Sequence, residues 1–457
     1  MFKNTKASIS FLSVSILQKI SSYLQKEILF KQKDADTSCQ SSVPTFDMRA
    51  CINVRCRQQR PWCIARLPLF SPLNKFTGQI LALLKNSRSG HAESTPWGGG
   101  ALVLDGRSHA EHWKREISAK VALRKNKFCL HPPGLAAIFI GDRTDSLLYV
   151  RRKGEACKEV GIRFHLEHLP ENTNQRTVIE VLRRLNADDR YHGILLQLPV
   201  PSHLNESRLL ELINPRKDVD GLHPNNVGRL AMRGTWRPAF MPCAPLGCME
   251  LLWRENISIK EKTVAVLGDS NVVGMPISWL LRDAGASSVH LMHGRGVNVL
   301  KEHNDFHNQA SRVSRQERSV EGLLRRFQEA DIIVSAVGSA GIVRSTWVKP
   351  GAIIIDVGIN AMPRHVHSVE VAAKCKCKSS RDYTKLVDSS AEKEFVIDNF
   401  SVSRSSLPDF RIVGDVAAEE VSRIAGAMTP VPGGIGPMTI AALLSNTYLG
   451  ASRQDYF

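Results

Sequence analysis

Two kinds of pattern are missing from this 457-residue sequence, and each absence narrows the possible classes of protein. None of the ten cysteines belongs to a CxxC pair that a second pair matches, which argues against a structural zinc site. The N-terminal region has no apolar run near the roughly 20 residues that a membrane-spanning helix requires. We therefore expect no metal site, no membrane contact and reduced cysteines. Four of the cysteines have the setting of small core residues: Cys129, Cys157, Cys243 and Cys248.

Acidic residues are absent before Glu27, whereas four lysines and several serines precede it. Apolar residues recur there at helical spacing, namely Phe11, Val14, Leu17, Ile20 and Leu24. A basic amphipathic helix of this kind is typical of an organelle transit peptide, so we expect a mitochondrial or plastid protein. The alternative is a disordered extension of a cytosolic protein.

The positive charge of the chain is unevenly distributed. Residues 1–97 contain fourteen Lys and Arg against five Asp and Glu, a net charge of +9 out of +17 for the whole chain. The basic excess therefore belongs mainly to an extension that ends in a glycine-rich linker, Gly98–Gly100, and we expect no nucleic-acid partner.

Strand and helix patterns alternate after this linker, which predicts an α/β fold with mostly parallel sheets. The folded part begins at 101–105. The first unit has expected strands at 134–140, 163–169 and 193–198, and expected helices at 110–123, 176–185 and 206–213. A break is expected at 242–247, followed by a helix at 248–255. The second unit has expected strands at 263–267, 288–292, 331–337 and 352–357, a helix through Leu281 and a final helix at 437–453.

Tyr149 and Lys153 stand four residues apart in the segment that follows the strand 134–140. If both lie in one helix, this spacing places an aromatic ring and an amine on the same face. The carboxyl end of a strand is where open α/β sheets build their sites. The alternative is a surface helix with a solvated lysine.

Three further stretches carry unusual residues. Gln197 interrupts the apolar stretch HGILLQLPVP, and a buried amide needs partners at both ends. Asp220 lies in KDVDGLHP, where a turn or helix-capping role is the plain alternative. Pro432–Gly436 (PGGIG) leaves the backbone bare, so a ligand can approach closely.

With these four stretches in this order, the chain closely resembles the methylenetetrahydrofolate dehydrogenase/cyclohydrolase family, over roughly 101–453 apart from two insertions. The resemblance implies oxidation of 5,10-methylene-tetrahydrofolate to the 5,10-methenyl form by a nicotinamide cofactor, then hydrolysis to 10-formyl-tetrahydrofolate. It implies a parallel-sheet catalytic domain, a Rossmann-like dinucleotide-binding domain, a site in the cleft between them, and a last helix that returns to the first domain. The expected parts are an extension at 1–97, a folate-binding catalytic domain at 98–245, a Rossmann-like domain at 246–430 with insertions at 298–319 and 364–408, and a substrate loop with the final helix at 431–457.

The resemblance also implies roles for single residues. Tyr149 would stack on the substrate, and Lys153 would carry the proton in the hydrolysis if burial and the cationic substrate favour its neutral form. Gln197 would fix the position of the amine, and Asp220 would accept hydrogen bonds from the pterin. The full expected substrate-binding set is Tyr149, Val150, Lys153, Leu196, Gln197, Leu198, Asp220, Pro432, Gly433, Gly434, Ile435 and Gly436.

GDSNVVG, at 268–274, corresponds to the family's altered dinucleotide fingerprint, and free amides at the following helix start would favour phosphate. The expected cofactor-binding residues are Gly268, Asp269, Ser270, Gly294, Arg295, Ile359 and Thr439. Three residues depart from the family habit: Asp269 replaces Arg, Gly294 replaces Ser, and Ala244 replaces Thr. We expect NADP, with weakened discrimination against NAD, because Asp269 opposes a 2′-phosphate whereas Arg295 can pair with one.

Two alternatives remain open at this point. His303 and His307 stand at helical i, i+4 spacing and could hold a metal, but a solvated helix face is the ordinary explanation. The chain could also be a non-catalytic folate-binding or RNA-associated relative on the same scaffold. The intact set of Tyr149, Lys153 and Gln197, with Asp220, favours an enzyme, which we expect to be a homodimer.

Overall fold

The computed structural model describes residues 100–128, 130–232, 237–293, 322, 324–363 and 410–454, all within one compact unit, Pro61–Phe457. Several expectations therefore lie outside the described residues. These are the transit segment and linker, both insertions with His303 and His307, Cys129, and the pair Gly294 and Arg295.

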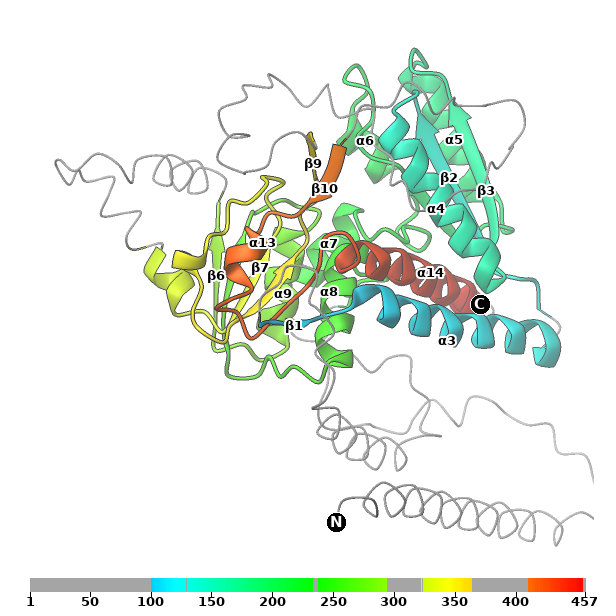
Figure 1. Cartoon of the computed structure of the whole chain (residues 1–457). Helices are drawn as coiled ribbons and strands as arrows, with labels where there is room; N and C mark the ends of the chain where they lie inside the picture. The colour runs from blue at the N-terminus through cyan, green and yellow to red at the C-terminus, as the bar shows by residue number, and fades with distance from the viewer. Residues whose placement is uncertain are drawn as a thin grey trace, which may run out of the picture. The chain divides into compact units, whose positions relative to one another are not determined.

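A small parallel sheet forms the first layer of the fold (Figure 1). Its order is β3-β2-β4, with β2 (Gly134–Ile140) between β3 (Arg163–Leu169) and β4 (Gly193–Leu196). All seven residues of β2 are buried, as expected for the central strand of a sheet covered on both faces. The helices of this unit are α4 (Thr144–Val160), α5 (Gln175–Ala187), α6 (Glu206–Glu211) and α7 (Pro224–Ala231).

The second sheet has six parallel strands in the order β1-β11-β8-β7-β5-β6. The strands are β1 (Leu102–Val103), β5 (Thr263–Leu267), β6 (Ser288–Met292), β7 (Ile332–Ser335), β8 (Ile353–Asp356) and β11 (Ala427–Met428). The strand order runs outward from β5 in both directions, so a topological switch point lies between β5 and β7. Open α/β sheets bind ligands at the carboxyl ends of strands at such a point. A separate antiparallel pair joins β9 (Asn360–Pro363) to β10 (Phe410–Val413).

Three long helices pack together beside the two sheets: α3 (Gly106–Phe128), α8 (Cys243–Arg254) and α14 (Ile435–Gln454). Helix α14 lies side by side with α3 in Figure 1, and it also contacts α8, α4, β2 and β4. The expected α/β fold is therefore confirmed, including the return of the last helix to the first unit.

Some element boundaries differ from expectation. The predicted break at 242–247 is wrong, because α8 already begins at Cys243, with Pro242 as its N-cap. Pro245 falls in the first turn, where a missing amide does not weaken the helix. Helix α7, which begins with Pro224, was not predicted. Strand β4 ends at Leu196, so Gln197 lies just beyond the strand rather than inside it.

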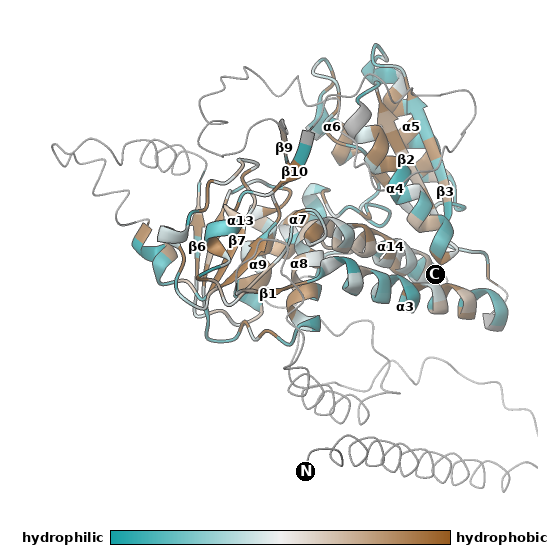
Figure 2. Ribbon diagram, in the orientation of Figure 1, coloured by the Kyte–Doolittle hydropathy of each residue, from teal (hydrophilic) through white to brown (hydrophobic). Residues whose placement is uncertain are grey.

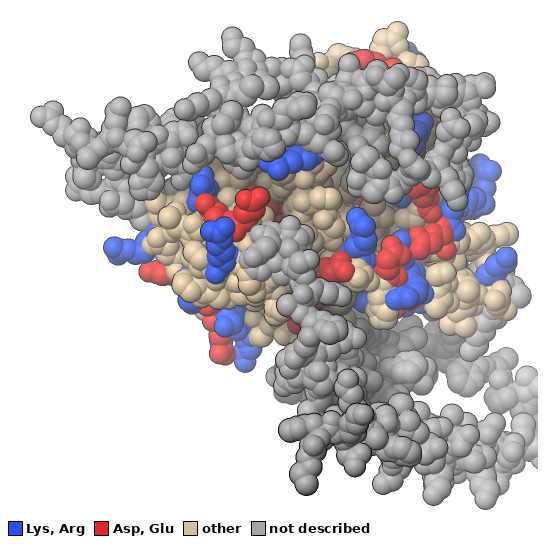
Figure 3. Space-filling model, viewed as in Figure 1, with Lys and Arg blue, Asp and Glu red and all other residues tan. Residues whose placement is uncertain are grey.

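Hydrophobic core residues lie around both sheets, and the largest fully buried side chains include Phe139, Phe240 and Trp347. Figure 2 shows hydrophobic residues along α14 and on the strands of both sheets. Cys157, Cys243 and Cys248 are buried free thiols, as expected. On the face shown in Figure 3, basic and acidic side chains are interspersed over the described part of the chain. No helix within the described ranges has both the length and the apolar character needed to cross a membrane.

Candidate active site

Lys153 lies in the middle of α4, and its side chain is almost completely enclosed, with a relative exposure of 6%. Its Nζ donates a hydrogen bond to Oε1 of Gln197 over 3.1 Å. The amide nitrogen of Gln197 donates to the Leu198 carbonyl over 2.8 Å, so both ends of the amide have partners. This arrangement fixes the amide with its oxygen toward the amine. The solvated-lysine alternative is therefore wrong.

Tyr149 stands one helical turn before Lys153, and Nζ of Lys153 lies 5.2 Å from the centre of its ring. Burial, followed by the negative charge of Asp220, raises the pKa of Tyr149 to about 12. The phenol therefore stays neutral at physiological pH and offers a flat surface rather than a proton acceptor. Because the charge of Asp220 acts on Tyr149, the two side chains belong to the same site.

A buried neighbour shapes the turn that presents Asp220. Asp218 is 1% exposed and accepts hydrogen bonds from the Leu222 and His223 amides and from Nδ2 of Asn226. Burial raises the pKa of Asp218 to about 6 despite these bonds. Asp218 thus takes the turn-forming role that was the plain alternative for Asp220, and Asp220 itself remains half-buried at the site.

Helix α14 holds the same segment from the other side. Asn446, buried in the middle of this helix, donates to the carbonyls of Val219 and Met241 over 2.8 and 3.0 Å. The Cys243 thiol also donates to the Val219 carbonyl, and burial together with Asp220 raises the pKa of that thiol. Asn446 was not singled out from the sequence, and Cys243 was expected only as a core residue. The only signal for Asn446 is a single amide within the apolar run AALLSNTYL.

The glycine-rich loop at 432–436 leads directly into α14. Gly433 has φ +113°, which favours glycine. A Cβ at Gly434 would lie 2.6 Å from the Pro430 carbonyl oxygen, so this position has no room for a side chain. At Gly436, by contrast, a Cβ would meet open space. The loop therefore combines a fixed backbone with an accessible surface.

A second candidate region lies at the carboxyl end of β5, at the switch point. Gly268 has φ +97°, and a Cβ there would lie 2.4 Å from the Ala336 carbonyl oxygen, just beyond β7. A Cβ at Gly274 would lie 1.8 Å from the Gly268 carbonyl oxygen, where α9 (Gly274–Asp283) begins. Strand, turn and helix are therefore packed closely enough to bring backbone to a dinucleotide, which fits the chemistry of such a cofactor.

The sequence predicted free amides at the start of α9, but the structure shows that some of them already have a hydrogen-bond partner. The Ser270 hydroxyl accepts from the Val273 and Gly274 amides over 3.2 and 3.4 Å. Ser270 therefore organises the turn.

Asp269 lies beside His293, the residue that follows β6, with 2.7 Å between Oδ2 and Nδ1. The two residues end neighbouring strands of the sheet, so they place a carboxylate and an imidazole where a Rossmann fold reads the adenosine ribose. His293 was not singled out from the sequence as a ligand-reading residue.

Two carboxylates hold the loops beyond β7 and β8 together. Asp415 accepts hydrogen bonds from the Val337, Gly338 and Ser339 amides. Asp356 accepts from the amides of Gly358, Asp415 and Val416. Burial, followed by the charge of Asp415, raises the pKa of Asp356 to about 7. These residues were also missed, because DVGIN and VGDV show no partner until the fold brings them together.

The remaining predicted residues occupy varied settings. Val150 and Leu196 are buried in the core. Leu198 is half-buried, whereas Ile359 is 58% exposed beyond β8. Thr439 donates to the Ile435 carbonyl within α14. In the described residues, His, Cys, Asp and Glu form no group of three that could hold a metal ion.

Comparison with known proteins finds two family models on this chain. The tetrahydrofolate dehydrogenase/cyclohydrolase catalytic domain matches residues 104–220. The NAD(P)-binding domain of the same family matches residues 242–305, 294–387 and 384–455.

Named relatives and solved structures agree with these matches. The chloroplastic bifunctional protein FolD 4 of Arabidopsis thaliana is 41% identical over 79% of this chain and 81% of its own length. The mitochondrial bifunctional protein FolD 1 of the same plant is 40% identical over 77% of this chain and 81% of its length. The Trypanosoma brucei methylenetetrahydrofolate dehydrogenase-cyclohydrolase, solved with NADP cofactor and inhibitor, is 31% identical with a TM-score of 0.61, covering 78% of this chain and 99% of that one.

Proposed function

Because the chain belongs to the tetrahydrofolate dehydrogenase/cyclohydrolase family, we propose that it is a bifunctional enzyme of one-carbon metabolism. It oxidises 5,10-methylene-tetrahydrofolate to the 5,10-methenyl form and hydrolyses that product to 10-formyl-tetrahydrofolate. The observation that carries the proposal is the enclosed Lys153 amine, held 3.1 Å from the Gln197 amide oxygen.

Lys153 transfers a proton in the hydrolysis step. Water that attacks the methenyl carbon must lose a proton, and the collapse of the resulting adduct needs that proton on the leaving nitrogen. A neutral Lys153 amine accepts the proton of the attacking water and, as an ammonium, returns it to the leaving nitrogen, while the hydroxyl proton of the adduct passes to solvent as the formyl carbonyl forms. The Gln197 oxygen accepts a hydrogen bond from the amine in either state, so it holds Nζ in place during both transfers.

Residues near Lys153 orient the substrate. The neutral ring of Tyr149 stacks on the pterin, which aligns the flat substrate at low entropic cost. The Asp220 carboxylate accepts from adjacent N–H groups of the amino-pyrimidine edge. The loop from Pro432 through Gly436 covers the substrate with backbone atoms.

The nicotinamide cofactor is NADP, with discrimination against NAD weaker than in the rest of the family. When bound, the cofactor would supply the hydride acceptor for the oxidation. Support comes from the close packing at Gly268 and from the NADP named for the Trypanosoma brucei structure. Asp269 adds negative charge near the ribose, and Gly294 and Arg295, with Ile359 and Thr439, complete the proposed contacts.

The proposal also covers the location, domain organisation and oligomeric state of the enzyme. Residues 1–97 act as a targeting extension, since the N-terminal pattern is that of a transit peptide and two relatives are named chloroplastic and mitochondrial. The folate-binding domain spans 98–245, the cofactor domain 246–430 and the returning segment 431–457. The enzyme acts as a homodimer.

Turnover by purified protein tests the proposal. With 5,10-methylene-tetrahydrofolate and NADP, the methenyl absorbance should rise and then fall as 10-formyl-tetrahydrofolate and reduced cofactor form. The non-catalytic rival predicts folate binding without any reduced cofactor, and that result would reject the enzyme.

A further inference from the structure

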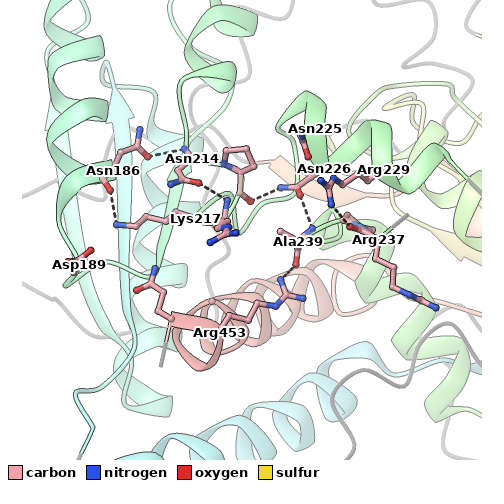
Figure 4. Close-up of a pocket in the computed structure, with 15 residues that line it drawn as sticks. Asn186, Asp189, Asn214, Lys217, Asn225, Asn226, Arg229, Arg237, Ala239 and Arg453 are labelled. Carbon is pink, nitrogen blue, oxygen red and sulfur yellow. Dashed lines mark hydrogen bonds between the residues drawn. The ribbon is translucent and has the colours of Figure 1, made fainter. Parts of the chain in front are cut away.

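A cavity of about 970 Å³ lies at the opposite end of the first sheet from the proposed active site. Its walls come from the end of α5, the segment 214–217, α7, residues 237–239 and the end of α14 (Figure 4). The Ile194 amide at the start of β4 donates to the Lys217 carbonyl, and a Cβ at Gly450 would lie 2.6 Å from the His192 carbonyl oxygen. Both contacts place the cavity at the amino end of β4.

The cavity is far from the substrate loop. Helix α14 carries that loop at its beginning and Arg453 in its last turn. At about 1.5 Å per residue, 18 residues from Ile435 to Arg453 separate the two ends by about 27 Å. A folate bound at Lys153 therefore leaves the cavity accessible.

The lining of the cavity is strongly basic. Among the described lining residues, five carry cationic side chains, namely Arg216, Lys217, Arg229, Arg237 and Arg453, and one, Asp189, is acidic. Four of the five are arginines, whose planar guanidinium matches carboxylate and phosphate oxygens. None of the lining residues that the structure describes is aromatic.

The two most enclosed cations are held by carbonyl oxygens rather than by carboxylates. Lys217 is 4% exposed, and its Nζ donates to the carbonyls of Asn186 and Asp188, each over 2.9 Å. Arg453 donates to the Ala239 carbonyl and lies 5.4 Å from the ring of Phe240. Burial lowers the pKa of both groups, and in the described part of the chain neither lies within ion-pair distance of a carboxylate. The negative charges of Asp189 and Asp188 offset part of the positive charge of Lys217, whereas in the described residues no carboxylate acts on Arg453 in this way.

Hydrogen bonds hold the walls in place without any ligand. Asn226 donates to the Pro215 carbonyl and accepts from the Ala239 amide. Asn186 donates to the Leu212 carbonyl and accepts from the Asn214 amide. Figure 4 shows the bonds among the lining residues, including those of Asn226 and the one between Asn186 and Asn214, with Lys217 on one side of the cavity and Arg453 on another. The cations are therefore presented by a fixed frame.

We propose that this cavity is a binding site for a small polyanion with at least two phosphate or carboxylate groups, separate from the folate and nicotinamide sites. Its volume lies at the upper end of the range for small-molecule sites, about 300 to 1,000 Å³, which suits a compound of nucleotide size or smaller.

Calorimetry on the full chain tests the site, with inorganic tripolyphosphate and citrate as probes at about 0.15 M salt. At least one probe should bind saturably at one site per chain, and the preferred probe identifies phosphate or carboxylate as the recognised group. The double variant Arg216→Gln with Arg229→Gln, at the exposed rim, should weaken binding by about tenfold or more. Arg453→Gln should do the same and thermal melting checks its fold.

Arg208→Gln provides the matched control, since Arg208 is exposed on the neighbouring α6, outside the cavity. Its affinity for the probe should equal that of the wild type, and saturating NADP should leave the wild-type affinity unchanged. The proposal is overturned if neither probe binds saturably, if NADP displaces the probe, or if the control loses as much affinity as the rim variant. It is also overturned if the rim variant binds as tightly as the wild type.

Discussion

Replacing Asp269 by arginine should change the choice of cofactor. The carboxylate lies two residues beyond β5, and its 2.7 Å contact with His293 holds it at the end of β6. We propose that the 2′-phosphate of NADP binds beside it. Two like charges about 5 Å apart repel by roughly 3 kcal/mol at an effective dielectric near 20, which corresponds to about a hundredfold in affinity. The Asp269 side chain is 36% exposed, so solvent and salt screen part of this repulsion. About tenfold is the expected lower bound.

The assay is kcat/KM for NADP and for NAD in the wild type, in Asp269→Arg and in Asp269→Asn. The arginine variant should raise the NADP value by about tenfold or more while the NAD value changes little, because only NADP carries the phosphate. The asparagine variant removes the charge without adding one and should give a smaller gain in the same direction. Equal changes for both cofactors would refute the reasoning, since Asp269 would then not sense the 2′ group.

Three further expectations concern other parts of the chain. A protein that starts at Gly98 should stay soluble and keep both activities, and a reporter fused to residues 1–40 should enter an organelle; a misfolded truncation or a cytosolic reporter would contradict each half. Gln197→Leu removes the acceptor of the Lys153 amine and should slow hydrolysis by about tenfold at unchanged melting temperature, whereas wild-type hydrolysis would remove its positioning role. The pKa of Asp356 in the native state is raised to about 7, above its ordinary value of 3.8. Between these two pH values the native state binds more protons than the unfolded state, so the free energy of unfolding should fall as pH rises from about 4 to about 7. Urea unfolding across that range should show a weaker fall in Asp356→Asn; parallel curves would assign the effect to other groups.

Much of the fold could be predicted from local pattern alone. The strand 134–140 is a continuous apolar run closed by a glycine, and the structure forms it with the same bounds. The helix carrying Tyr149 and Lys153 also forms, because its spacing and its αL cap at Gly161 agree. β1 could not be placed in this way. It precedes the first sheet in sequence but pairs with β11 in the second, since parallel pairing is decided by the three-dimensional path of the chain.

Some residues of the candidate site could also be predicted from the sequence, and others could not. Lys153 and Gln197 could be joined before the structure was known only through the family resemblance, and the hydrogen bond between them confirms that they meet. Asn446 and His293 were missed because their partners lie on other segments, up to 227 positions away for Asn446 and Val219. Asp218 was missed although its partners Leu222, His223 and Asn226 lie within eight positions. A polar residue in an apolar run can be predicted to need a hydrogen-bond partner, but the partner cannot be identified from the sequence.

The proton-carrying role of Lys153 is the central claim, and a time course of methenyl absorbance in Lys153→Met tests it most directly. Methionine keeps an unbranched stem of similar length and removes the amine, while Lys158→Met on the exposed side of the same helix serves as the control. We predict that methenyl-tetrahydrofolate accumulates in the Lys153 variant, with enzymatic hydrolysis slowed by about 10² to 10⁴ relative to wild type and control. Hydrolysis at the wild-type rate in folded Lys153→Met would contradict the account.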